Sequence, residues 1–247
     1  MSIKSKVFAA AATLTLVGGV TAVGAMSASA ATPSAGPTAI DIFSYEFGHH
    51  SSPNFVVDTW RQSAKVGQPI ILFRTSDTDP AEDFTVSFQG LVSDFFAAGL
   101  VSAAIDLHYG SNLPNASDGF PDDPAFEIEY APYGVESGLC VGVAATAVQG
   151  SKVALEPCGV SSKTVWVTDT GDSTTVTSGY VPLINGSDTN FSHPFVLTYP
   201  ENGYPTDVPR PQLTTTNLTG FSGSFLVPEL GTVDDNQLWG ADFGVLR

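Results

Sequence analysis

Short apolar runs recur three times along the chain in the same order. Each copy is introduced by one apolar run and continues with three strand-length runs, of which the last carries an aromatic residue. Because one such unit is too small to bury its own apolar face, the repetition predicts one pseudo-symmetric all-β domain rather than three independent modules. The copies begin at Phe55, Leu139 and Phe195, and their introductory runs begin at Ala39, Phe126 and Tyr180.

Alternation within a run predicts how the strand is buried. In the introductory run of the second copy, Phe126, Ile128 and Tyr130 alternate with Glu127 and Glu129, which predicts one face in the core and one in solvent. The two glutamates share a strand face, as a glycosidase carboxylate pair would. We favour a solvated strand face over such a catalytic pair.

The segment Leu91–Ala104 allows two interpretations. Its apolar residues at positions 91, 92, 95 and 96 favour a short helix, but Gly99 in the middle weakens a helix. A strand over Leu100–Leu107 is an equal alternative.

The first 30 residues have the organisation of an export signal. Lys4 and Lys6 form a basic start, Val7–Ala25 is apolar, and Ala28–Ala30 is a small-residue cleavage site. A membrane anchor is the alternative, but no further apolar run of about 20 residues follows. We therefore expect a signal peptide over 1–30, a flexible lead-in over 31–38, one domain over 39–247, and a secreted, extracellular protein.

The charge balance limits the partners. The chain has 25 acidic and 9 basic residues and a net charge of -16, which becomes -18 (-16 - 2) without the two leader lysines. Nucleic acids and anionic membranes are bound through Lys and Arg, so we expect neither as a partner. Charged residues make up only 14% of the chain, which is typical of an acidic extracellular β protein with a surface of Ser, Thr, Asn and Gly. We expect a monomer.

The two cysteines, Cys140 and Cys158, suit a structural disulfide. An even pair in an exported chain should be oxidised, and a loop of this size contributes about 3 kcal/mol in the chain-entropy model. Zinc ligation is a poor alternative because no histidine spacing matches it. We expect no metal and no cofactor.

Other catalytic or metal-binding patterns are incomplete. His49 and His50 are adjacent and would point to opposite faces of a strand. The run GFSGS from Gly220 misses the nucleophile-elbow pattern at its last position. A loop cluster of acids lacks the glycine and the final glutamate of an EF-hand, so a solvated acidic turn is preferred over a calcium site. These acids are Asp77, Asp79, Glu82 and Asp83.

Specific motifs occur in the second and third copies. The second contains GLCVGV from Gly138, GSKVALEPCG from Gly150 and TVWV from Thr164, and the third ends in DNQLWG from Asp235. These segments resemble the half-cystine strands, the Trp strand and the Gln-x-Trp signature of the ricin-B type β-trefoil lectins. The resemblance implies a β-trefoil, in which three four-strand units form a six-stranded barrel capped by a hairpin triplet. The copies start 84 (139 - 55) and 56 (195 - 139) residues apart, so long insertions must lie in loops, where binding differences usually arise.

The same resemblance implies a sugar site. The family holds sugar with a carboxylate just after the first strand of a copy, a stacking aromatic ring, and an Asn beside the Gln-x-Trp motif. This chemistry suits sugars because carboxylates and amides bond adjacent hydroxyls, while an aromatic face covers C–H groups. The residues at the matching positions are Asp58, Trp60 and Phe73 in the first copy and Tyr199, Tyr204, Asn236 and Gln237 in the third.

No copy carries the full set. Ala81–Glu82 replaces Asn-Gln in the first copy, and Thr198 replaces the acid in the third. The second copy has Gly142 in the acid position and Lys163–Thr164 in place of Asn-Gln, so we expect it to be inactive. Within the first copy, Asp58 and Trp60 would share a strand face and are the best candidates for a sugar contact.

Some of these residues have a plainer interpretation. Phe84, Trp166 and Trp239 share one position in the copies, and large aromatic residues at such a position fill a barrel core. We expect Gln237 to bond neighbouring backbone rather than ligand.

The sequence therefore predicts a secreted, non-catalytic, lectin-like protein whose partner is an extracellular glycan or polysaccharide. The function rests on fold-level resemblance. The alternative is a secreted protease inhibitor or protein-binding module, in which a loop such as Ala104–Pro124 or Tyr199–Pro211 binds a protein partner. A polysaccharide-degrading enzyme ranks last, because no motif places a catalytic acid.

Overall fold

The computed structural model describes residues 39–48, 55–76, 78–110, 122–168, 179–190, 192–200, 212–224, 227–230 and 233–244. All of them belong to one compact unit, 33–247. The expected signal peptide, the lead-in 31–38 and Tyr204 lie outside the described residues. Among the described residues, no helix has the length and apolar character needed to cross a membrane.

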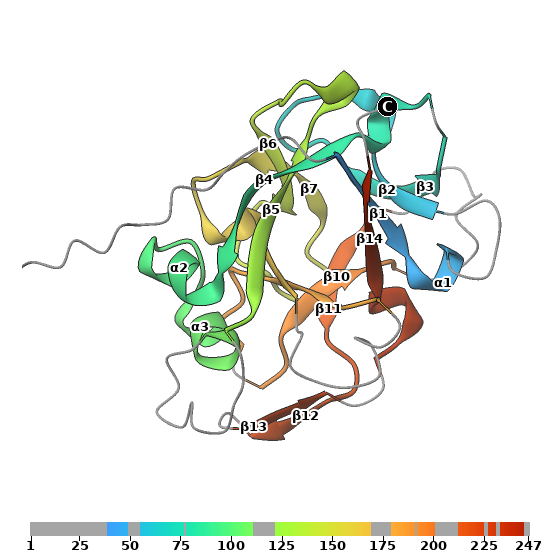
Figure 1. Cartoon of the computed structure of the whole chain (residues 1–247). Coiled ribbons are helices and arrows are strands. Elements are labelled where there is room, and N and C mark those ends of the chain that lie inside the picture. The colour runs from blue at the N-terminus through green and yellow to red at the C-terminus, as the bar shows by residue number, and fades with distance from the viewer. Residues whose placement is uncertain are drawn as a thin grey trace, which may run out of the picture. The chain divides into compact units, whose positions relative to one another are not determined.

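Six strands form a closed barrel. β1 pairs with β14 and β4, β4 with β5, β5 with β8, and β8 with β9. A backbone bridge between Val181, just before β9, and Trp239 of β14 closes the ring. Figure 1 shows β1 and β14 side by side although they come from opposite ends of the domain. The barrel strands are β1 (Ala39–Ser44), β4 (Phe84–Leu91), β5 (Pro124–Tyr130), β8 (Val165–Thr168), β9 (Leu183–Asn185) and β14 (Trp239–Gly244).

Three hairpins cap one end of this barrel. Each hairpin is bridged to the other two, through Pro69–Ala154, Ile71–Gln212 and Lys152–Thr214. The closed barrel and the hairpin triplet together are a β-trefoil, so the predicted all-β, β-trefoil fold is confirmed. The hairpins are β2 (Phe55–Thr59) with β3 (Ile70–Arg74), β6 (Leu139–Val143) with β7 (Val153–Pro157), and β10 (Phe195–Thr198) with β11 (Thr214–Asn217).

Insertions and short turns complete the described elements. Two helices, α2 (Val92–Ala97) and α3 (Ala103–Tyr109), lie between β4 and β5, and the hairpin β12 (Phe221–Ser224) with β13 (Val227–Leu230) lies between β11 and β14. The remaining short elements are α1 (Tyr45–Gly48), η1 (Trp60–Gln62), η2 (Pro80–Glu82), η4 (Pro132–Gly134), η5 (Ser162–Thr164) and η6 (Asp235–Gln237).

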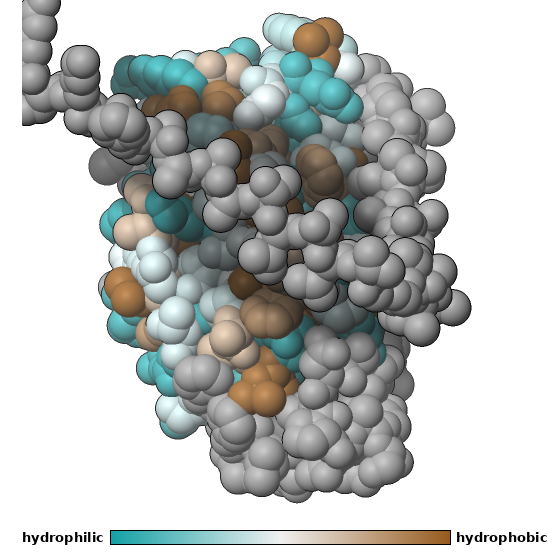
Figure 2. All heavy atoms as spheres, turned by 90° about the vertical axis from the view of Figure 1, so that its left-hand side faces the viewer, coloured by the Kyte–Doolittle hydropathy of each residue, from teal (hydrophilic) through white to brown (hydrophobic). Residues whose placement is uncertain are grey.

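The two helices settle the ambiguous segment. The helix interpretation is confirmed by α2, and the alternative strand over Leu100–Leu107 is wrong. Gly99, with φ of 73°, follows α2 in a conformation that suits glycine. Ser102 then caps α3, because its Oγ accepts a hydrogen bond of 3.2 Å from the Ile105 N–H. Figure 2, which views the side carrying these helices, shows a mainly hydrophilic or neutral surface with separate apolar patches where residues are described.

The shared aromatic position lies in the core, as predicted. Phe84, Trp166 and Trp239 are each at most 1% exposed and belong to one buried cluster inside the barrel and its cap. The expected disulfide between Cys140 and Cys158 is also present, with a Cα–Cα distance of 5.1 Å. It joins the start of β6 to the residue just after β7.

The prediction of a solvated outer face on β5 is wrong. Glu127 is 0% and Glu129 5% exposed, although both point away from the apolar side of the strand. Glu127 accepts hydrogen bonds from the Gly159 N–H and the Thr164 hydroxyl, and Glu129 accepts one of 2.6 Å from the Gly138 N–H. The chain around the disulfide therefore covers these carboxylates.

Candidate functional site

A polar pocket of about 300 Å³ lies where η6 meets the β10–β11 hairpin. We call it the third-copy pocket. It brings together Tyr199, Asn236 and Gln237, three of the residues predicted for ligand binding. Its lining residues are Gln149, Thr198, Tyr199, Pro200, Thr216, Asn217, Thr219, Asp234, Asn236 and Gln237.

Gln237 holds the pocket wall together. Its side chain is 2% exposed, and its Oε1 accepts hydrogen bonds from the N–H and the hydroxyl of Thr219 at 2.8 and 2.9 Å. Its Nε2 donates to the Thr216 hydroxyl and to the Asn217 carbonyl, both at 2.8 Å. These four bonds use the whole capacity of the amide. Gln237 therefore positions its neighbours and has no spare group for a ligand.

Asn236 differs from its neighbour in having a spare acceptor. Its Nδ2 donates to the Tyr199 carbonyl at 3.1 Å, and the Tyr199 N–H donates to the Asn236 carbonyl at 3.0 Å. Its Oδ1 is buried and has no hydrogen-bond partner among the described residues. An unsatisfied buried polar atom costs about 1–3 kcal/mol, so a donor that reaches Oδ1 after a small movement of the Asn236 side chain binds favourably.

The Tyr199 ring belongs to the core rather than to the pocket surface. It is 1% exposed and packs edge-on against Phe47, with ring centroids 5.2 Å apart. Thr198, which occupies the expected acid position, is also committed, because its hydroxyl donates to the Val196 carbonyl and bonds the Thr216 hydroxyl. The pocket therefore offers no exposed aromatic face from Tyr199.

Three pocket residues escaped the sequence analysis. Asp234 is exposed and supplies a carboxylate two residues before Asn236. The run Asp-Asp-Asn-Gln, in which Asp234 directly precedes another aspartate, was the local signal that could have identified it. Gln149 and Asn217 meet across copies, because the Asn217 N–H donates to Gln149 Oε1 at 2.9 Å. No local pattern marks Gln149, which comes from a loop of the second copy.

The first-copy candidates are arranged differently from the prediction. Asp58 is 4% exposed within β2, and Phe73 lies half-buried in β3. β2 ends at Thr59, so Trp60 opens the turn η1 instead of continuing the strand face of Asp58. Arg61, in a left-handed conformation with φ of 60°, lies 5.5 Å from the Trp60 ring centre.

The position equivalent to Asn236 in the first copy carries no polar side chain. Both η2 and η6 follow an aspartate, Asp79 or Asp234, which aligns Ala81 with Asn236. Ala81 is 2% exposed and offers only a methyl group. Asp79 Oδ1 accepts from the Ala81 N–H at 3.0 Å and from Gln62 Nε2 at 2.9 Å, so this acid caps the turn.

The second copy has no room for an acid. A Cβ atom at Gly142 would lie 2.8 Å from both the Lys163 carbonyl oxygen and Thr164 Cγ2. The Thr164 side chain is 0% exposed. These contacts explain physically why the second copy is expected to be inactive.

The carboxylates of Glu127 and Glu129 are hydrogen-bonded to other groups of the protein, whereas a catalytic pair would need to be accessible to a substrate. Burial raises the pKa of Glu127, and bonds from Thr164 and Gly159 oppose that shift. Burial also raises the pKa of Glu129, against the hydrogen bond from Gly138. Gly138 and Gly159 both have positive φ, 72° and 69°, so each carboxylate holds a turn that flanks the disulfide.

One group of potential metal ligands lies close together in the described part of the chain. There, the group of potential ligands whose atoms lie within 4.8 Å of one another is Glu127, Cys140 and Cys158. Both sulfur atoms are joined in the disulfide, so neither is a thiolate that binds metal.

No family model matches the chain, and no curated protein matches it in sequence. The solved structures that resemble it at low similarity include the following three. The designed 3-fold symmetric protein ThreeFoil has a TM-score of 0.47 and 13% identity, covering 82% of this chain and 96% of its own. The Rhizoctonia solani agglutinin has a TM-score of 0.46 and 14% identity, covering 86% and 100%. A mosquitocidal holotoxin has a TM-score of 0.47 and 10% identity, covering 85% of this chain and 18% of the toxin. These values assign no function, and the β-trefoil assignment rests on the strand pairing.

Proposed function

We propose that this protein is a secreted, non-catalytic carbohydrate-binding protein and that the third-copy pocket holds one sugar residue of an extracellular glycan. The observation that carries the proposal is the buried Oδ1 of Asn236, which has no partner among the described residues. It lies in a pocket whose other polar groups are amides, hydroxyls and a carboxylate. Sugars present arrays of neighbouring hydroxyls, which such groups bind.

Each polar group has a stated role in this proposal. A sugar hydroxyl donates to Asn236 Oδ1, and a neighbouring hydroxyl donates to the exposed carboxylate of Asp234. Gln149, whose Oε1 accepts a hydrogen bond from the Asn217 N–H, lines the pocket from a loop of the second copy. At about 300 Å³ the pocket is at the small end of ligand sites, which suits a single ring. Because the pocket offers few polar contacts and no exposed Tyr199 ring, we expect weak binding. The expected Kd is on the order of 1 mM, which corresponds to a binding free energy of about -4 kcal/mol.

The test is a glycan and insoluble-polysaccharide binding screen of the purified protein with two variants. Asn236→Ala removes the spare acceptor, and Trp60→Ala removes the first-copy candidate. We expect binding that Asn236→Ala abolishes and Trp60→Ala leaves unchanged. Side-chain amide resonances of Asn236 should shift in NMR spectra on sugar titration.

Other outcomes would contradict the proposal in distinguishable ways. Binding lost only in Trp60→Ala would place the site in the first copy. A negative screen would favour the protein-binding alternative and lead to protease-inhibition and pull-down assays. Released reducing sugar would indicate an enzyme.

Secretion is part of the proposal and has its own test. The leader motif and the acidic, lysine-poor composition support export. Mass spectrometry of the protein from the culture medium should show a mature chain that begins at Ala31 or Thr32. An intact Met1 on cell-retained protein would contradict export.

A further inference from the structure

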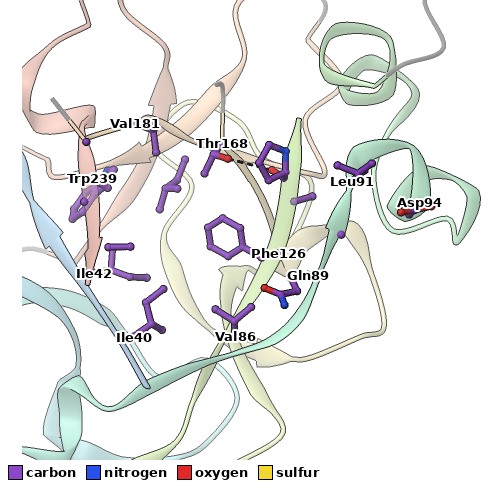
Figure 3. A pocket seen from close by; sticks show the side chains of 17 residues that line it. Ile40, Ile42, Val86, Gln89, Leu91, Asp94, Phe126, Thr168, Val181 and Trp239 are labelled. Carbon is purple, nitrogen blue, oxygen red and sulfur yellow. Dashed lines mark hydrogen bonds between the residues drawn. The ribbon is translucent and has the colours of Figure 1, made fainter. Parts of the chain in front are cut away.

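A second and larger cavity, about 620 Å³, lies inside the barrel at the end remote from the hairpin cap. We call it the barrel cavity. All six barrel strands contribute to its lining, including the last residues of β4 and β8, Leu91 and Thr168, and the first residue of β5, Pro124. Figure 3 shows the Phe126 ring between Ile40 and Ile42 on one side and Gln89 and Leu91 on the other.

The inner wall of the barrel cavity is apolar. Ile40, Ile42, Leu183 and Trp239 are each at most 3% exposed, and Phe126 is half-buried. The one polar atom of the Trp239 side chain, Nε1, already donates to the Leu197 carbonyl at 2.9 Å. Trp239 therefore presents only ring carbon to the cavity.

Water fits this cavity poorly. At about 30 Å³ per molecule in the liquid, the volume corresponds to roughly 20 waters, which would bond mainly to one another because the described lining offers few polar partners. The polar side chains of the described lining are Gln89, Asp94 and Thr168, of which Gln89 and Asp94 are exposed. The Thr168 hydroxyl already donates to the Pro124 carbonyl at 3.4 Å. An apolar molecule that displaces such water binds favourably.

We propose that the barrel cavity binds an uncharged apolar small molecule, a medium-chain or cyclic hydrocarbon or its alcohol. The volume lies within the range of small-molecule sites. Asp94 is the one charged residue of the described lining, and it disfavours a carboxylate head group. An alcohol hydroxyl can donate to Asp94 or Gln89 while its apolar part fills the barrel. This site is separate from the third-copy pocket, so either proposal can fail alone.

The test uses the uncharged dye N-phenyl-1-naphthylamine with the full purified protein. We expect saturable binding to one site and displacement by dodecan-1-ol. Dodecanoate should displace the dye at least tenfold more weakly, because of Asp94. Val181→Trp, which fills the cavity, should weaken dye binding at least tenfold. The control Val160→Trp adds the same side chain at a 68% exposed position outside the lining and should change nothing.

Crystals pressurised with xenon give a second measurement that needs no variant. Xenon density beside Phe126 and Trp239 is the expected result. The proposal is overturned if the dye fails to saturate, or if folded Val181→Trp binds it as well as the native protein does. It is equally overturned if the cavity holds only ordered water or a segment of the chain itself.

Discussion

The indole Nε1 of Trp239 donates a hydrogen bond of 2.9 Å to the carbonyl oxygen of Leu197. Trp166 makes the same bond, also 2.9 Å, to the carbonyl of Val141. Leu197 and Val141 hold the same place in their hairpins, so in two copies a buried tryptophan ties a barrel strand to the cap. Phe84 stands at this position in the first copy and has no N–H to donate.

Because of these hydrogen bonds, replacing a tryptophan should lower the free energy of unfolding by more than the lost side-chain volume alone would. Trp166→Phe leaves the Val141 carbonyl without its donor and creates a small void. We expect the free energy of unfolding to fall by about 2–4 kcal/mol, from the unsatisfied acceptor and the lost packing. Urea denaturation measures the change, with Trp60→Phe as a matched control outside the core. A loss below about 0.5 kcal/mol would show that the bond contributes little.

Substitutions at the two adjacent amide residues of the third-copy pocket, Asn236 and Gln237, should have different effects: one mainly on glycan binding and the other mainly on stability. Gln237→Ala leaves Thr219, Thr216 and Asn217 groups without partners, and we expect a loss of about 2–4 kcal/mol. Asn236→Ala removes an acceptor that has no described partner and one hydrogen bond, from Nδ2 to the Tyr199 carbonyl, so it should cost about 1 kcal/mol while it abolishes glycan binding. Denaturation and glycan titration of both variants check this. Equal stability losses would contradict the assignment of roles.

The strands and their threefold order follow from local pattern, whereas several site features do not. Apolar runs such as Phe55–Thr59 predict their strand because aromatic and β-branched residues favour strands locally. The burial of Glu127 depends instead on Gly159, 32 residues further along the chain. The hydrogen-bond donors to Glu127 come within reach of its carboxylate only after the disulfide-linked turn has folded over β5. The contact between Gln149 and Asn217 likewise joins different copies.

Local signals also existed that the sequence analysis did not use. Ser102 followed by Ala103–Ala104 is an N-cap before good helix formers, which predicts the start of α3. The barrel cavity had no such signal. It depends on the summed volume of side chains from six strands, so no single stretch of sequence contains it.

The carboxylate of Glu127 should contribute to stability together with the disulfide. Glu127→Ala leaves the Gly159 N–H without its buried acceptor and leaves the Thr164 hydroxyl only the Ser161 carbonyl at 3.2 Å, and we expect a loss of about 2–4 kcal/mol. Because Gly159 follows Cys158 directly, losses from Glu127→Ala and from Cys140→Ala with Cys158→Ala should not add. A double-mutant cycle by urea denaturation measures the coupling. The exposed Glu136→Ala serves as control, and additive losses within about 0.5 kcal/mol would contradict coupling.

Asp188 should make stability depend on pH in the acidic range. Its side chain is 0% exposed, and its carboxylate accepts hydrogen bonds of 2.7 Å from the N–H groups of Asn190 and Phe195. Burial raises the pKa of this carboxyl from 3.8 to about 6, against those bonds. The folded state therefore binds more protons than the unfolded state between these values.

The sign of the effect follows from that proton balance. The contribution of Asp188 to stability is fully present below about pH 3.8 and is lost as the pH rises through about 6. The shift of roughly two units limits this loss to about 3 kcal/mol. Burial raises the pKa of Glu127 and Glu129 too, so their contributions change in the same direction. Urea denaturation between pH 4 and 7 should show a slope that Asp188→Asn reduces, whatever that variant does to stability at one pH. Parallel profiles for the two proteins would mean that Asp188 titrates near its ordinary value despite its burial.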